Sequence, residues 1–142
     1  MRGLRDRESL AHGAWDWSTL FEALPFCAGN LDGLYVLRNG YALGLEAKRA
    51  SPLAPPHVGT AQWLALRTLA DCGNFEVLLL GGDPSKSEFY WIRKLSPGFD
   101  SGWQRTTTDV VRSEIRVWYE THRDLPPFWE ARRENDFEAW SW

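Results

Sequence analysis

The chain has 142 residues and a formal net charge of −3. That length suits one domain, which buries roughly two-thirds of the surface that its unfolded chain exposes. No apolar run approaches the roughly 20 residues of a membrane span, and the segment Met1–Glu8 lacks the apolar core of a signal peptide, so we expect a cytoplasmic protein. The acidic balance disfavours a protein that binds duplex DNA through many phosphate contacts, because such proteins are usually basic.

The acidic residues are unevenly distributed, which weakens this argument against DNA binding. Several of them crowd the C-terminal end of the chain: Glu130, Glu134, Asp136 and Glu138. Without this end the rest of the chain is close to neutral, and a bound divalent cation would invert the charge of an acidic site. We therefore expect any affinity for DNA to be modest and sensitive to salt.

The N-terminal part of the chain is expected to be a loose segment followed by a helix. Residues 1–14 are polar and mixed in charge. From Trp15 to Leu24 the apolar residues recur at spacings of three and four, which predicts an amphipathic helix capped by Asp16 or Ser18. Pro25 and the glycine-containing stretch after it end this helix.

A β-hairpin is predicted next. Residues 31–37 alternate well enough for a strand, Asn39-Gly40 is a strong hairpin signal, and residues 41–48 form the returning strand. The three prolines within residues 51–56 remove backbone donors and fix φ, so this segment is predicted to be a loop directly after the hairpin.

A helix over residues 58–72 and two further strands are predicted to follow. The helix ends at Gly73, a ready C-cap, and its predicted buried stripe is Ala61, Leu64, Ala65, Thr68, Leu69 and Cys72. Residues 75–80 are apolar enough for a buried strand, and residues 88–95 are predicted to be a more charged strand. The two cysteines, Cys27 and Cys72, are not in a C-x-x-C pair, and we expect both to be reduced and partly buried.

The last part of the chain is predicted to be helical. Residues 107–121 form a helix capped by Thr107 or Thr108, whose inner face is Val110, Val111, Glu114, Ile115, Trp118 and Tyr119. After Pro126-Pro127 a short amphipathic helix is predicted over residues 128–140. The order α-β-β-α-β-β-α predicts an α/β fold with a small mixed sheet of about four strands flanked by helices. The chain is thus divided into a loose segment (1–14), a domain (15–124) and a tail (125–142).

The register of the hairpin decides whether Asp32 and Glu46 meet. If Asn39-Gly40 were a two-residue turn, Gly33 would face Glu46 and Asp32 would project from the opposite side of the sheet. If the loop were Arg38-Asn39-Gly40 with Gly40 in a left-handed conformation, Asp32 would lie directly across from Glu46 with Cβ atoms about 5 Å apart. Two carboxylates at that spacing repel unless a cation lies between them. Both registers are open at this point.

An ordered set of residues resembles the PD-(D/E)xK nuclease superfamily, most closely its small phage and bacterial members. The matching features are Phe21-Glu22 in the first helix, Leu31-Asp32-Gly33, Leu45-Glu46-Ala47-Lys48-Arg49, a helix bearing Gln62, and the strand at residues 75–81. Leu31 stands where the family usually has proline before the first acid. The resemblance covers nearly half of the chain and implies a restriction-endonuclease-like α-β-β-α-β core.

The resemblance also implies a metal centre. Asp32, Glu46 and the backbone carbonyl of Ala47 would bind Mg²⁺ or Mn²⁺, cations that prefer oxygen ligands and retain several waters. Lys48 would orient the attacking water or offset charge on the phosphate, and Gln62 would contact substrate or nucleophile. An exposed glutamate and lysine at a strand end are otherwise usually a solvated surface, and that structural alternative remains open.

Further residues are weaker candidates. Glu22 resembles the accessory acid of the first helix, with Asp16 as a competitor and an ordinary helix-surface charge as the alternative. Basic side chains that could follow a nucleic-acid backbone, or simply form a solvated rim, are Arg49, Lys86, Arg93, Lys94 and Arg105.

Two functions of different classes follow. The first is a Mg²⁺-dependent nuclease that hydrolyses DNA phosphodiester bonds in phage or bacterial DNA processing. The second is a nuclease-fold protein with little or no catalysis that binds protein or nucleic acid. The aromatic tail could fold back on the domain, pair two copies in a homodimer or dock a protein partner; its aromatic residues are Trp129, Phe137, Trp140 and Trp142.

Overall fold

The computed structural model describes residues 31–130, which belong to one compact unit that begins at Leu31. The predicted loose N-terminal segment, the first helix with Asp16 and Glu22, and Cys27 lie outside the described residues, as does the tail from residue 131 onward. Within residues 31–130, no helix combines the length and hydrophobicity that a membrane span requires.

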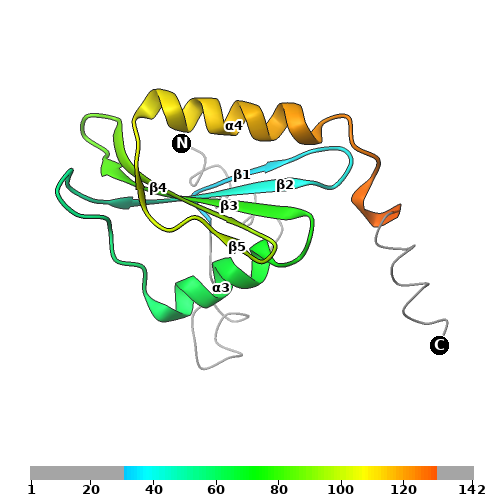
Figure 1. Ribbon diagram of the computed structural model, residues 1–142, viewed down its shortest axis with the longest axis horizontal. Helices are drawn as coiled ribbons and strands as arrows, with labels where there is room; N and C mark the ends of the chain where they lie inside the picture. The colour runs from blue at the N-terminus through cyan, green and yellow to red at the C-terminus, as the bar shows by residue number, and fades with distance from the viewer. Residues whose placement is uncertain (1–30, 131–142) are drawn as a thin grey trace, which may run out of the picture. The chain divides into compact units, whose positions relative to one another are not determined.

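The described residues form a mixed sheet with a helix on each face (Figure 1). The elements in chain order are β1 (Gly33–Val36), β2 (Ala42–Arg49), α3 (Thr60–Ala70), β3 (Phe75–Asp83), β4 (Glu88–Ser96), β5 (Phe99–Asp100), β6 (Gln104–Arg105) and α4 (Thr108–His122). The strand order is β1-β2-β3-β4-β5, and β6 also pairs with β4. Strands β2 and β3 are parallel and the other pairs are antiparallel.

This architecture confirms the predicted α/β fold with a mixed sheet flanked by helices. The segment between β4 and α4, where no strand was predicted, contributes the two short strands β5 and β6. Strand β3 runs to Asp83, three residues past its predicted end, because Lys48 and Arg49 of β2 continue to pair with Gly81 and Gly82.

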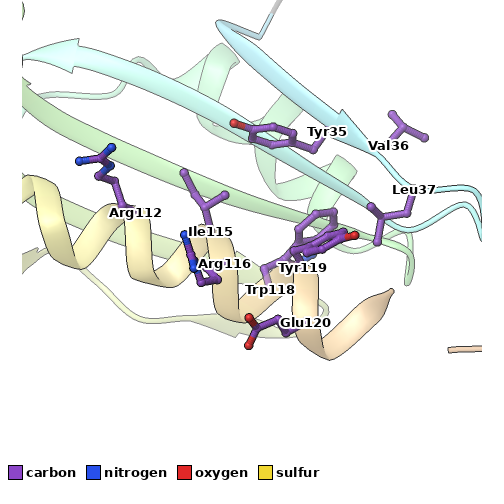
Figure 2. Close-up of a pocket in the computed structure, with 9 residues that line it drawn as sticks. All are labelled: Tyr35, Val36, Leu37, Arg112, Ile115, Arg116, Trp118, Tyr119 and Glu120. Carbon is purple, nitrogen blue, oxygen red and sulfur yellow. The ribbon is translucent and has the colours of Figure 1, made fainter. Parts of the chain in front are cut away.

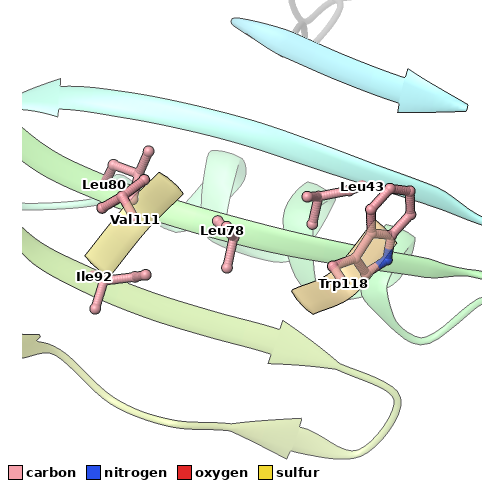
Figure 3. Close-up of a cluster of buried hydrophobic side chains, with 6 residues drawn as sticks. All are labelled: Leu43, Leu78, Leu80, Ile92, Val111 and Trp118. Atoms are coloured by element: carbon pink, nitrogen blue, oxygen red, sulfur yellow. The ribbon is translucent and has the colours of Figure 1, made fainter. Parts of the chain in front are cut away.

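Strand β3 is buried on both faces, as expected for the centre of a sheet covered on two sides. On one face a cluster packs beneath α4: Leu43, Leu78, Leu80, Ile92, Val111 and Trp118 (Figure 3). On the other face a second cluster packs against α3: Leu66, Ala70, Val77, Leu79 and Leu95. Alternate residues of β3 therefore supply the two cores.

The buried face of α3 differs from the predicted stripe. Leu66 is 3% exposed and Ala70 is fully buried, whereas Leu64 is 58% exposed; other members of the predicted stripe are also exposed, namely Ala61, Ala65, Thr68 and Cys72. The predicted stripe was wrong because the helix is rotated so that residues 62, 66 and 70, one turn apart, face the sheet. The prediction that Cys72 is partly buried was wrong for the same reason.

Helix α4 matches its predicted limits closely. The Thr107 side chain accepts a hydrogen bond from the backbone N–H of Val110, which satisfies a free donor of the first turn. Val111 and Trp118 are buried as predicted, but Val110 and Tyr119 are exposed, so the apolar face in contact with the sheet is narrower than the sequence pattern.

The hairpin turn is held by residues from the start of the tail. Asn39 is buried, and its side-chain amide donates to the carbonyl oxygens of His122 (2.7 Å) and Leu125 (3.1 Å). The backbone N–H of Phe128 donates to the Asn39 carbonyl oxygen at 2.9 Å. Residues 125–130 thus fold back on the hairpin turn.

Candidate functional site

Strands β1 and β2 bring Asp32 beside Glu46. The pairs Gly33–Leu45 and Val36–Ala42 fix the register, and a three-residue loop with Gly40 at φ 87° closes the hairpin. Extending this register by one residue brings Asp32 beside Glu46, and the charge of Asp32 acts on the Glu46 carboxylate. The three-residue loop is confirmed, and the two-residue alternative, which would have separated the two acids, is wrong.

Asp32 is fixed by two hydrogen bonds at the end of the hairpin. Its backbone N–H donates to the Leu45 carbonyl oxygen at 3.0 Å, and its Oδ2 accepts from the Ala47 N–H at 2.8 Å. The Asp32 side chain is exposed. It therefore presents a positioned carboxylate at the surface, next to the strand that carries Glu46.

Glu46 is buried, with only 6% of its surface exposed. Its Oε1 accepts a hydrogen bond from Nε2 of Gln62 at 2.7 Å, so the first turn of α3 reaches one oxygen of the carboxylate. Its Oε2 is buried and has no hydrogen-bond partner within residues 31–130. An orphaned carboxylate oxygen is costly to bury, and it marks a position for a ligand.

The surroundings of Glu46 hold its pKa above the ordinary value of 4.5. Burial is the largest cause, because it disfavours the charged form, and the negative charge of Asp32 adds to it. The hydrogen bond from Gln62 and the positive charge of Lys48 act in the opposite direction. The positive charge of a cation bound between the two acids would offset both effects, because it favours the ionised form of Glu46.

Lys48 projects from the same face as Glu46, because the two residues are two apart on β2. Across the parallel β2–β3 pair, Glu46 lies beside Leu79 and Lys48 beside Gly81. Leu79 packs in the cluster beneath α3. Glu46, Lys48 and Gln62 therefore share the space between the end of β2 and the start of α3.

Ala47 lies between these residues with its backbone turned toward Asp32. Its N–H donates to the Asp32 carboxylate, and in a β-strand the N–H and C=O of one residue point to the same side. The Ala47 carbonyl oxygen thus faces the side of β2 where Asp32 lies, as a further oxygen ligand would require.

These groups fit a hard divalent cation. Two carboxylates and a carbonyl oxygen match the ligands of Mg²⁺, which usually takes one or two carboxylates and keeps several waters. Such a cation would give the buried Oε2 of Glu46 the partner that it lacks among the described residues. No group of three or more His, Cys, Asp or Glu side chains suited to a metal occurs in the part of the chain that the structure describes. Glu22, the predicted accessory acid, lies outside that part.

Four of the five basic residues predicted to follow a nucleic-acid backbone fall into two groups. Arg93 forms a bidentate pair with Asp100 at 2.8 and 2.7 Å, and Lys94 pairs with Glu114 at 2.8 Å. Arg49 and Lys86 are exposed. The first two side chains are engaged by carboxylates within the domain, whereas the second two project into solvent.

A close contact at Gly81 shapes the site and escaped the sequence analysis. A Cβ at Gly81 would lie 2.7 Å from Cδ of Pro56, so only glycine lets the proline-containing loop lie against β3 beside Lys48. The signal was present in the sequence, since consecutive glycines in an apolar strand often mark close backbone approach.

Comparison of the chain with protein-family models, with curated proteins and with solved structures gave no match. The geometry of the Asp32–Glu46 site is therefore the basis on which a function can be proposed.

Proposed function

We propose that the protein is a divalent-metal-dependent nuclease of the PD-(D/E)xK type that hydrolyses DNA phosphodiester bonds. The observation that carries the proposal is the position of Asp32 beside a buried Glu46 whose second oxygen has no partner among the described residues. A structural role has no need of two adjacent carboxylates, one of them buried at a cost.

Each residue would have a distinct task. Asp32, Glu46 and the Ala47 carbonyl would hold Mg²⁺ or Mn²⁺, and the bound cation would supply Lewis-acid activation of water and charge compensation at phosphorus. Gln62 would hold one oxygen of Glu46 and leave the other free for the ion. Lys48 would place a positive charge beside the phosphate and offset the charge that develops in the transition state.

The experiment is a cleavage assay with a matched set of variants. The purified protein is incubated with supercoiled plasmid and with single-stranded DNA in Mg²⁺, Mn²⁺ or EDTA. Cleavage is expected with either metal and not in EDTA. Glu46→Gln is expected to reduce cleavage below detection, and Lys48→Met to reduce it by about a hundredfold, the scale of one lost electrostatic contact in a transition state.

Glu120→Gln is the control, because it makes the same chemical change at an exposed position on α4. It should cleave at the wild-type rate. A calorimetric titration with Mn²⁺ gives a second measurement, in which binding should be lost with Glu46→Gln and retained with Glu120→Gln. Cleavage that survives Glu46→Gln, or its absence from the wild-type protein in either metal, would contradict the proposal.

The alternative function is a nuclease-fold protein that binds a protein or nucleic acid without cleaving it. One observation favours it. A cavity of about 670 Å³ lies between β1 and α4, on the sheet face opposite α3. Figure 2 shows Tyr35, Leu37, Ile115 and Tyr119 at this cavity. The lining combines apolar and aromatic side chains with Arg112, Arg116 and Glu120. A cavity of this mixed character, separate from the Asp32–Glu46 site, would suit binding, and the cleavage assay separates the two functions.

A further inference from the structure

The loop that follows β2 begins with a tight turn whose apex is apolar. Residues 51–54 form this turn, closed by a bridge between Ser51 and Ala54 and by a hydrogen bond of 3.2 Å from the Leu53 N–H to Ser51 Oγ. Leu53, at the apex, is 92% exposed. Single exposed leucines are common on protein surfaces, so the surroundings of this turn decide whether Leu53 has a role.

The turn 51–54 is anchored to the sheet at its base. The indole N–H of Trp91 donates to the Ser51 carbonyl oxygen at 2.9 Å, and the guanidinium of Arg105 donates to the Pro52 carbonyl oxygen. Arg105 also lies over the Trp91 ring, 5.1 Å from its centroid. Pro52 fixes one backbone dihedral within the turn. Leu53 therefore cannot bury itself by a movement of the loop without breaking these contacts.

The anchors place the turn beside the Asp32–Glu46 site. Lys48 pairs with Gly81 of β3, Gly81 with Trp91 of β4, and Trp91 with Arg105 of β6. One row of paired residues thus runs across the sheet from the candidate site to the residues that hold the turn. The turn also begins at Ser51, three residues after Lys48 and two after the end of the same strand.

The charge around the turn suits a polyanion. No acidic residue occurs between Glu46 and Asp71 in an otherwise acidic chain. Arg49 and Arg105 are exposed on the strands at the base of the turn. A leucine flanked by proline and exposed arginines resembles the apolar wedges that proteins insert between base steps, where the basic residues contact the adjacent phosphates.

We propose that Leu53 is a wedge that enters duplex DNA at a base step and unstacks it next to the scissile phosphate. This inference rests on the proposed nuclease function and narrows its substrate to duplex DNA that is opened locally. The rigid turn makes insertion effective, because little conformational freedom is lost when it binds. The unstacked step would bring the strand to be cut toward Lys48 and the two acids.

The test measures unstacking separately from cleavage. A duplex carrying 2-aminopurine at successive positions is mixed with the full-length protein in EDTA, and binding is followed by anisotropy. The wild-type protein is expected to bind and to raise the fluorescence at one step. Leu53→Ala should bind about tenfold more weakly, the scale of one lost leucine contact, without the rise. Leu64→Ala, which shortens an exposed leucine on α3, is the control and should behave as wild type.

The outcomes distinguish the two proposals. A fluorescence rise with wild type that Leu53→Ala loses supports the wedge, even where no metal gives cleavage and the nuclease proposal fails. A rise that Leu53→Ala retains, binding without any rise, or no binding to DNA overturns the wedge. In the cleavage assay, Leu53→Ala should cut an intact duplex more slowly than wild type but a duplex with a mismatched bubble at the same rate. Equal loss on both substrates overturns the wedge and leaves the nuclease proposal standing.

Discussion

The side-chain amide of Gln62 lies 2.7 Å from Oε1 of Glu46 and donates a hydrogen bond to it. This contact joins α3 to β2 and holds the buried carboxylate from one side only, because its other oxygen has no partner in residues 31–130. A residue of the helix thereby lowers the pKa of the acid on the strand, against the larger effect of burial.

Gln62→Leu is expected to raise the pKa of Glu46 further, because the hydrogen bond from Gln62 lowers it. The pH at which Mn²⁺ binding is half-maximal should therefore move upward, since protons compete with the metal for Glu46. The variant should also lose about 1–3 kcal/mol of stability from the unmade hydrogen bond. Calorimetry across pH measures the first effect and urea unfolding the second. Gln104→Leu, the same change at an exposed position of β6, should alter neither.

Glu46→Gln is expected to stabilise the metal-free protein at neutral pH. Because the folded-state pKa of Glu46 is raised, the folded protein holds a proton that the unfolded chain has released when the pH lies between 4.5 and the raised pKa. Wild-type stability should thus fall as the pH rises from 4.5 through the raised pKa. The Glu46→Gln variant lacks this fall in stability. Its free energy of unfolding at pH 7 should exceed that of the wild-type protein by about 1 kcal/mol, the scale of the penalty for an unsatisfied buried polar group.

Saturating Mn²⁺ should reverse that order, because metal binds the folded wild-type protein and raises its melting temperature. Thermal unfolding between pH 4 and 8, with and without metal, measures both effects. A wild-type melting temperature that does not respond to Mn²⁺ would contradict metal binding at Glu46.

Gly40→Ala tests the contact between the hairpin turn and the start of the tail. Gly40 has φ 87°, and an added Cβ would lie 2.5 Å from Cδ1 of Phe128. Gly98→Ala is the matched control, because Gly98 also has positive φ (66°) but nothing within 4 Å. Both variants should lose about 1 kcal/mol from the backbone conformation. Gly40→Ala should lose about 1–3 kcal/mol more from crowding; equal losses in urea unfolding would show that Phe128 does not pack there in solution.

Leu66→Ala and Leu64→Ala test the rotation of α3. Leu66 is buried against the sheet and Leu64 is exposed on the same helix. Leu66→Ala should destabilise the protein by about 2–5 kcal/mol, the usual cost of a leucine-sized cavity. Leu64→Ala should change stability by less than about 0.5 kcal/mol, as surface substitutions usually do. Urea unfolding of the two variants measures the difference. A larger loss of stability for Leu64→Ala than for Leu66→Ala would instead indicate that the stripe predicted from the sequence faces the sheet.

The sequence was sufficient to predict the fold class and to reduce the hairpin to two registers. The alternation of strand residues and the choice of turn residues are local signals. Gly40 at the third position of the loop defines the three-residue alternative, in which Asp32 is opposite Glu46. The structure selects that register. It could not be chosen from the sequence alone, because Asn39-Gly40 also suits a two-residue turn, and the tail residues that pack against Gly40 are far away in the chain.

The orientation of α3 was not predictable in the same way. The helix carries apolar residues on more than one side, and hydrophobic spacing alone does not tell which side meets the sheet. The predicted stripe would also have turned Gln62 away from Glu46. The predicted stripe and the predicted role of Gln62 in the site were therefore incompatible. Gln62 lies one turn before Leu66, and the burial of Leu66 and Ala70 is what directs Gln62 toward Glu46.

The pairing of Arg93 with Asp100 and of Lys94 with Glu114 was likewise hidden from the sequence. Both acids come from elements that follow β4, and their positions depend on the short strand β5 and on the packing of α4. Charges that are candidates for phosphate contacts in sequence can be satisfied inside the domain once the chain is folded.

The parallel pairing of β2 with β3 has a consequence for synthesis on the ribosome. The hairpin that carries both acids can form as soon as it leaves the exit tunnel, but β3 and α3 are translated later. Until they dock, Glu46 stays solvated and ionises as an ordinary surface acid. A nascent chain that ends before β3 would contain both carboxylates but lack the buried environment that raises the pKa of Glu46. The site should therefore acquire its chemical properties only late in translation.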